Sequence, residues 1–191
     1  MKNRQKNLVA QLSDKELLWN FYVSQLFIFC IGILLSRLIF QNWFYPFSLF
    51  NWADTKIITV GLSAALFVII LDVCFMKLLP KTVYDDGGIN ERLFSNRRRW
   101  HIVVMTLIVA FGEEILFRGV LQTAFGLVVA SLLFAFVHFR YLFHPFLFAN
   151  VVILSFVIGV IFQTTENLAV CVLMHFIIDC SLGFIIHSKR N

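Results

Sequence analysis

Long apolar runs separated by short polar segments dominate the pattern of this chain. Six such runs cover residues 21–40, 57–79, 102–124, 127–139, 145–162 and 168–186. A membrane-spanning helix needs about 20 apolar residues, with about 17–25 as the usual range. Four runs reach this length easily, 145–162 is at its lower limit, and 127–139 is short. We interpret 127–139 as a span extended by polar residues at its end, although its length is also typical of a re-entrant segment.

The composition indicates a membrane protein as well. Of 191 residues, 60% are hydrophobic and 14% are charged. In soluble domains, about a quarter of all residues are charged. Pattern and composition together predict an all-α, polytopic membrane helix bundle with about six transmembrane helices. Because no internal repeat or linker is evident, we expect one membrane domain over 1–191, with two spans and a basic loop in 1–100 and the other helices in 101–187. The segment Ser-Asp-Lys-Glu at 13–16 is typical of a capping box, and it predicts that the first helix begins ahead of the membrane.

The lysine and arginine residues indicate the orientation of the bundle. With six spans, both termini share one side of the membrane with the loops 80–100 and 140–144. That side holds thirteen of the sixteen basic residues: Lys2, Arg4, Lys6, Lys15, Lys77, Lys81, Arg92, Arg97, Arg98, Arg99, Arg140, Lys189 and Arg190. The positive-inside rule therefore places both termini in the cytoplasm. The same asymmetry accounts for the net charge of +5, so we expect no nucleic-acid binding.

Ionisable residues inside the predicted spans are the candidates for chemistry. They are Asp72, Glu113, Glu114, Arg118, His138, His175 and Asp179. Each charged side chain costs at least about 2.5 kcal/mol at the bilayer centre, so such residues are expected to face one another and to serve a function. Asp72 stays open between a hydrogen bond to another helix and support of a site.

Three of these residues lie close together in the run 102–124. Glu114 and Arg118 are four residues apart on one helix face, in the order that favours an ion pair. Glu113 is rotated by about 100° from Glu114 around the helix. The arginine can therefore hold one glutamate while the other points elsewhere.

Two further runs supply histidines. His138 shares a helix face with Phe134, and His175 shares one with Asp179. A glutamate surrounded by imidazoles from other helices can activate a water molecule as a general base, once burial and neighbouring groups adjust its pKa. A glutamate and two histidines can also hold a catalytic zinc ion. The residues alone leave both possibilities open.

The order of these motifs resembles the CPBP family, which comprises the CAAX prenyl proteases of type 2 and the bacteriocin-processing (Abi) intramembrane proteases. The motifs are Glu-Glu-x-x-x-Arg at 113–118, Phe-x-x-x-His at 134–138 and His-x-x-x-Asp at 175–179. The resemblance covers about residues 100–184. Three motifs in order are far more specific than one, whereas the first two spans carry no motif of the family.

The resemblance implies a role for each motif residue. Glu113 and His138 would activate the water that attacks the scissile carbonyl, and His175 and Asp179 would stabilise the oxyanion. Relatives that act on prenylated proteins tend to have Asn at the position of Asp179, whereas bacterial relatives often have Asp. Since an ionised Asp would repel an oxyanion, we expect Asp179 to be protonated or to orient His175. The geometry of the site would be held by Glu114 and Arg118.

The function implied is that of an intramembrane endopeptidase of the cell membrane, of glutamic type and without a cofactor, acting on a membrane-associated protein or peptide. A zinc-dependent version with Glu113, His138 and His175 as ligands remains the alternative. A non-proteolytic bacteriocin-immunity protein and a transporter or proton relay also stay open, although no inverted repeat supports a transporter. The small size suggests a bacterial host, in which prenylated substrates are not expected.

Overall fold

The computed structural model describes residues 11–188, and nearly all of this part is helical, without a strand. This confirms the all-α prediction. The elements are α2 (Asp14–Phe40), η1 (Tyr45–Leu49), η2 (Ile57–Leu62), α3 (Ser63–Leu78), α4 (Lys81–Tyr84), α5 (Ile89–Phe94), α6 (Arg99–Glu114), η3 (Ile115–Gln122), α7 (Thr123–Val137), η4 (Phe139–Tyr141), α8 (Pro145–Thr165) and α9 (Leu168–Ser188).

Helix α2 begins at the predicted capping box. The backbone N–H of Ser13 donates to Oε2 of Glu16 at 2.7 Å, and the backbone N–H of Glu16 donates to Oγ of Ser13 at 3.3 Å. Two N–H groups that the first helical turn leaves without a partner are thereby satisfied.

Five stretches of the described chain are long and apolar enough to cross a membrane. They are Asp14–Phe40, Ile57–Leu78, Arg99–Val137, Pro145–Thr165 and Leu168–Ser188. Four of them correspond to predicted spans. The prediction needs correction for the other two runs, because 102–124 and 127–139 form a single stretch of 39 residues.

Gly126 explains this difference, because it divides the long stretch. Its φ of 83° and ψ of 171° lie outside the helical region and are readily adopted only by glycine. Beyond it, the ring of Phe134 contacts that of Phe117 with centroids 4.9 Å apart, so the arm after Gly126 folds back along η3. At 1.5 Å per residue this arm, which ends at Val137, is too short to cross a hydrocarbon core of about 30 Å. The sixth passage through the bundle is a short returning arm.

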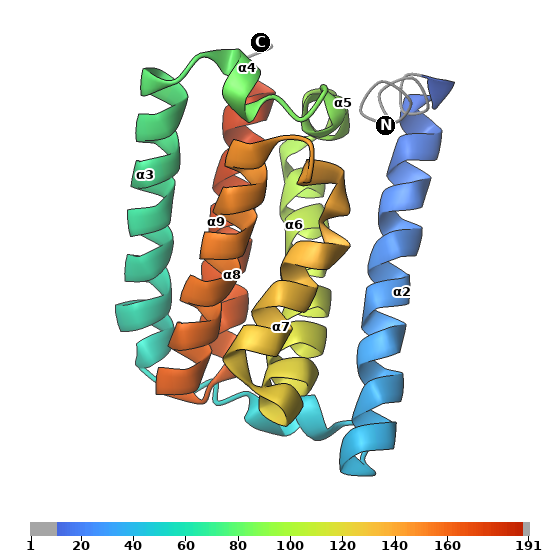
Figure 1. Cartoon of the computed structure of the whole chain (residues 1–191), viewed down its shortest axis with the longest axis vertical. Coiled ribbons are helices and arrows are strands. Elements are labelled where there is room, and N and C mark those ends of the chain that lie inside the picture. Colours follow the sequence, from blue (N-terminus) through green and yellow to red (C-terminus); the bar gives the residue numbers. More distant parts are fainter. Residues whose placement is uncertain (1–10, 189–191) are drawn as a thin grey trace.

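The helices stand side by side, with α2 at one edge and α3 at the other (Figure 1). Helix α2 begins and α9 ends at the same end of the bundle, where α4 and α5 also lie. The connection between α2 and α3, which includes η1, lies at the opposite end. This arrangement agrees with an even number of passages.

Helix α9 is the central helix of the bundle. It packs against α3, α5, α6 and α8. Half of the residues in its most apolar part are buried, whereas only 17% of those in the corresponding part of α2 are buried. The outer faces instead carry exposed apolar side chains, such as Leu38, Leu78 and Phe136. Large exposed apolar surfaces mark contact with a membrane or a partner. On the outside of a bundle of several apolar helices, they indicate a multi-pass membrane protein.

The predicted orientation can be tested by cysteine labelling. We expect a cysteine at Asn96 to react with an impermeant maleimide only after the cells are permeabilised. A cysteine at Glu166, at the other end of the bundle, should react in intact cells. The four native cysteines are first replaced by serine or alanine. External labelling of the Asn96 position would contradict a cytoplasmic location for both termini.

Candidate active site

The first motif lies where α6 passes into the π-helix η3. Glu113, Glu114 and Arg118 are all buried, with exposed fractions of 4%, 0% and 1%. Nε of Arg118 lies 3.3 Å from Oε2 of Glu114, so the predicted ion pair is present. π-helical turns are rare and occur frequently at functional sites.

Glu114 also contacts the central helix. Nδ1 of His175 donates to Oε1 of Glu114 at 2.7 Å, and Nε2 of His175 lies 3.5 Å from Oδ2 of Asp179. The same histidine therefore has a carboxylate beside each ring nitrogen. The first and third motifs are joined directly through Glu114 and His175, a contact that helical spacing within one segment could not predict.

Arg118 extends the network to a third helix, α8. Its Nη2 donates to the carbonyl oxygen of Ser155 at 2.8 Å and to Oγ of Ser155 at 3.1 Å. The guanidinium also lies over the ring of Phe134, 4.8 Å from the centroid. Sequence reasoning missed Ser155, because a serine inside an apolar run carries no signal of its own.

His138 follows the last residue of α7 and is held by Phe134. Nδ1 of His138 donates to the carbonyl oxygen of Phe134 at 2.8 Å, and the two rings stack at 4.6 Å. The ring of Phe134 also meets that of His175 edge-on at 6.2 Å. Because Nδ1 is the donor, Nε2 is the nitrogen that a neutral His138 offers as a base.

Glu113 and His138 lie the same number of residues beyond the ring contact that joins the two arms on either side of Gly126. Phe117 and Phe134 face each other across the two arms. Glu113 precedes Phe117 by four residues (117 − 113) and His138 follows Phe134 by four (138 − 134), so both lie equally far beyond that contact. No hydrogen bond joins Glu113 to His138 among the described residues. Oε2 of Glu113 is buried without a hydrogen-bond partner in that part of the chain, which is unusual for a buried polar atom.

The residues of the alternative zinc set do not come together. In the described part of the chain, no three His, Cys, Asp or Glu side chains are grouped as a metal ion would require. Both nitrogens of His175 lie beside carboxylates, and Nδ1 of His138 is bonded to a backbone carbonyl.

Asp72 lies near the site without belonging to a motif. Its helix, α3, packs along α9, and its side chain is half-buried. The carboxylate is close enough to Asp179 for their charges to interact. Of the two readings left open by the sequence, this placement favours support of the site.

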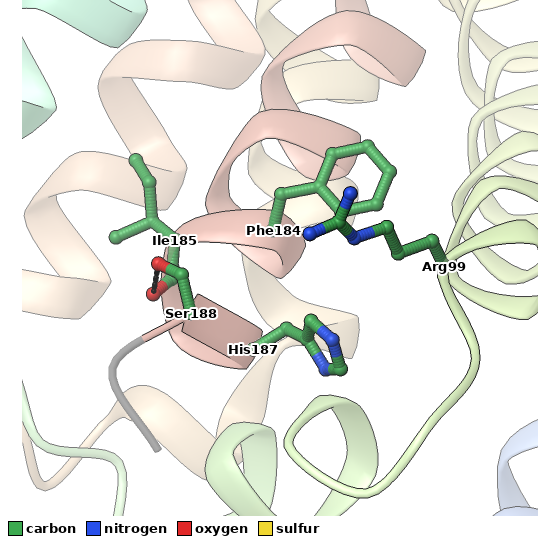
Figure 2. Close-up of a pocket in the computed structure, with 5 residues that line it drawn as sticks. All are labelled: Arg99, Phe184, Ile185, His187 and Ser188. Carbon is green, nitrogen blue, oxygen red and sulfur yellow. Dashed lines mark hydrogen bonds between the residues drawn. The ribbon is translucent and has the colours of Figure 1, made fainter. Parts of the chain in front are cut away.

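A hollow of about 370 Å³ lies apart from these residues, at the end of α9 (Figure 2). It is lined by Arg99, Phe184, Ile185, His187 and Ser188. Figure 2 shows Arg99 reaching from the start of α6 towards the ring of Phe184. No motif residue lines this hollow, so it is not part of the candidate active site.

Comparison with known proteins agrees with the motifs. Residues 95–181 match the family model described as "Type II CAAX prenyl endopeptidase Rce1-like". The chain is also 48% identical over 147 residues to "Uncharacterized protein YpbD" of Bacillus subtilis (strain 168), an alignment that covers 75% of this chain and 77% of the relative. The chain belongs to the CPBP family. No solved structure gives a significant match.

Membership in the CPBP family confirms the resemblance seen in the sequence and implies a peptidase. The match begins just before α6 and ends in α9, close to the limits of 100–184 that the motifs suggested. It includes all seven motif residues. Helices α2 and α3 lie outside it, in agreement with their lack of family motifs.

The two adjacent glutamates should differ in their effect on stability. Glu114→Gln leaves Arg118 and His175 without their buried carboxylate, and breaking a buried ion pair in this way costs about 3–5 kcal/mol. Glu113→Gln removes a carboxylate whose buried oxygen has no partner in the described chain, so it should leave stability unchanged or raise it. Thermal unfolding of both variants in the same detergent measures the difference. Equal losses of stability would contradict the division of roles.

Proposed function

We propose that this CPBP protein is an intramembrane endopeptidase that hydrolyses a peptide bond of a membrane-associated protein or peptide. It acts in the cell membrane with both termini in the cytoplasm. The observation that carries the proposal is the buried Glu113, whose Oε2 has no hydrogen-bond partner in the described chain, next to the paired set of Glu114, Arg118 and His175.

In this proposal, Glu113 and His138 activate the water molecule. The buried Oε2 of Glu113 is available for a hydrogen bond, and the Nδ1–H of His138 is committed to Phe134, which leaves Nε2 for a water proton. The water oxygen attacks the scissile carbonyl carbon while its proton passes to the base. The same proton then moves to the departing amine, so the catalytic groups return to their starting state.

His175 and Asp179 stabilise the tetrahedral oxyanion in the proposed mechanism. The contact of His175 Nδ1 with Glu114 directs Nε2 towards Asp179, at 3.5 Å. Asp179 therefore stands where it either orients Nε2 or, in its protonated form, donates to the oxyanion. Preorganised donors of this kind are worth about 10²–10³ in rate.

Loss of the base tests the proposed reaction. Glu113→Gln preserves shape but removes the basic carboxylate, so we expect cleavage to vanish while the protein still folds. Comparison of membrane proteins and secreted peptides between wild-type and Glu113→Gln cells should reveal fragments that depend on Glu113. Glu91→Gln, which alters an exposed glutamate, serves as the matched control. An identical peptide pattern in wild type and Glu113→Gln would favour the immunity-protein or transport alternatives.

Removal of metal tests the glutamic mechanism. Because the described residues do not group into a metal site, we expect the purified protein to keep its activity after dialysis against chelator. Its zinc content should be well below one ion per chain by elemental analysis. Stoichiometric zinc that is lost together with activity, and that restores activity on return, would establish the zinc-dependent alternative.

A further inference from the structure

The turn after His138 carries a polar cluster that no family motif includes. It consists of Arg140 and Tyr141 in η4, with Asp86 and Asn90 from the segment around the start of α5. Tyr141 and the side chain of Asp86 are both only 8% exposed. These side chains therefore form a packed contact between two parts of the chain.

Arg140 is the centre of this cluster. Its Nη2 donates to Oδ1 of Asn90 at 3.1 Å and to the hydroxyl of Tyr141, and it lies 3.9 Å from Oδ2 of Asp86. Its guanidinium stands over the Tyr141 ring, 4.5 Å from the centroid. The planar guanidinium donates in several directions at once, which the ammonium of a lysine could not reproduce in the same geometry.

The partners of Arg140 are themselves fixed. The backbone N–H of Asn90 donates to Oδ2 of Asp86 at 3.1 Å, and Nδ2 of Asn90 donates to the hydroxyl of Tyr141 at 3.4 Å. The connection between α3 and α6 is thus joined to the turn that ends the α7 arm.

Tyr141 relates the cluster to the active site. Its backbone N–H donates to the carbonyl oxygen of His138 at 2.9 Å. Its ring is nearly parallel to that of His138, at 9° and 6.3 Å between centroids. The imidazole is therefore stacked with Phe134 and lies parallel to Tyr141, and Arg140 determines where Tyr141 lies.

The charge of Arg140 also reaches the site. Glu113 is close enough for its charge to act on that of Arg140. The His138 ring lies parallel to that of Tyr141, over which the Arg140 guanidinium stands.

We propose that Arg140 is a positioning residue of the active site: held by Asp86 and Asn90, it fixes Tyr141 and thereby the orientation of the His138 imidazole. This inference rests on the proposed function, because that proposal assigns water activation to His138. It makes Asp86 and Asn90, around the start of α5, a part of the active-site framework. If the cluster only fastened that segment to the bundle, the variants described below would lower stability and leave His138 unchanged.

Nitrogen NMR of histidine tests the proposal without knowledge of the substrate. The full chain is labelled with ¹⁵N-histidine in lipid nanodiscs, and His138 is assigned by comparison with His138→Gln. We expect a single Nδ1–H tautomer of His138 in the wild type and loss of that signature in Arg140→Gln. Asp86→Asn should cause a smaller change in the same direction, and Arg140→Lys should restore only part of the wild-type spectrum.

Lys81→Gln is the matched control, because it removes an exposed basic side chain of the same segment whose partner is the exposed Glu91. It should leave the His138 signals unchanged. In cells, Arg140→Gln should reduce the fragments that depend on Glu113 by about 10- to 100-fold, as expected for a misplaced catalytic group. Fragment levels in Lys81→Gln should equal those of the wild type.

Wild-type His138 signals in both Arg140→Gln and Asp86→Asn would overturn the proposal, whatever the activity. If Arg140→Gln does not fold, Arg140→Lys and Asp86→Asn decide the question by the same measurement. If the His138 signals change but no fragment depends on Glu113, Arg140 positions His138 and the proposed peptidase function is wrong. The two failures are therefore distinguishable.

Discussion

The buried carboxylate of Glu114 is the group on which the rest of the site depends. It lies between the guanidinium of Arg118 and the imidazole of His175, and its side chain has no exposed surface. Any one of these groups alone would be costly inside an apolar bundle, whereas together they offset one another's desolvation. Because Arg118 also donates to Ser155, this one carboxylate fixes α6, α8 and α9 relative to one another.

This arrangement leaves Glu113 available for chemistry. A single helix supplies two neighbouring glutamates, and Glu114 pairs with Arg118 and accepts a hydrogen bond from His175. Glu113 is buried, and Oε2 of its carboxylate has no hydrogen-bond partner among the described residues.

Those features of the fold and the site that depend on spacing within one helix could be predicted from the sequence. The capping box at Ser13 and the Glu114–Arg118 pair follow from spacing within one helix, and both are present. The pairing of Glu114 with His175 could not be predicted, since it depends on how two helices pack. A break at Gly126 was predicted by the separation of the runs 102–124 and 127–139, whereas the path of the second arm back along η3 depends on packing between the two arms.

Contacts that depend on helix packing, and that the sequence does not predict, are most evident in the N-terminal half. It carries no family motif, yet its glycines allow close contact with the motif-bearing helices. A Cβ at Gly32 would lie 3.4 Å from Cα of Leu116, and one at Gly61 would lie 3.0 Å from the carbonyl oxygen of Val170.

Through these contacts, the segments from α2 to α5 support the helices that carry the motifs. Helix α2 approaches the backbone of η3 at Leu116, two residues before Arg118. Similarly, η2 approaches the backbone of α9 at Val170, five residues before His175. Helix α3 then brings Asp72 near Asp179, and the following segment contributes Asp86 and Asn90 to the turn after His138. A chain reduced to the family-matched residues 95–181 would keep every motif and lose all of these contacts. The motifs identify the candidate catalytic groups, whereas the segments outside them pack against the helices that carry these groups.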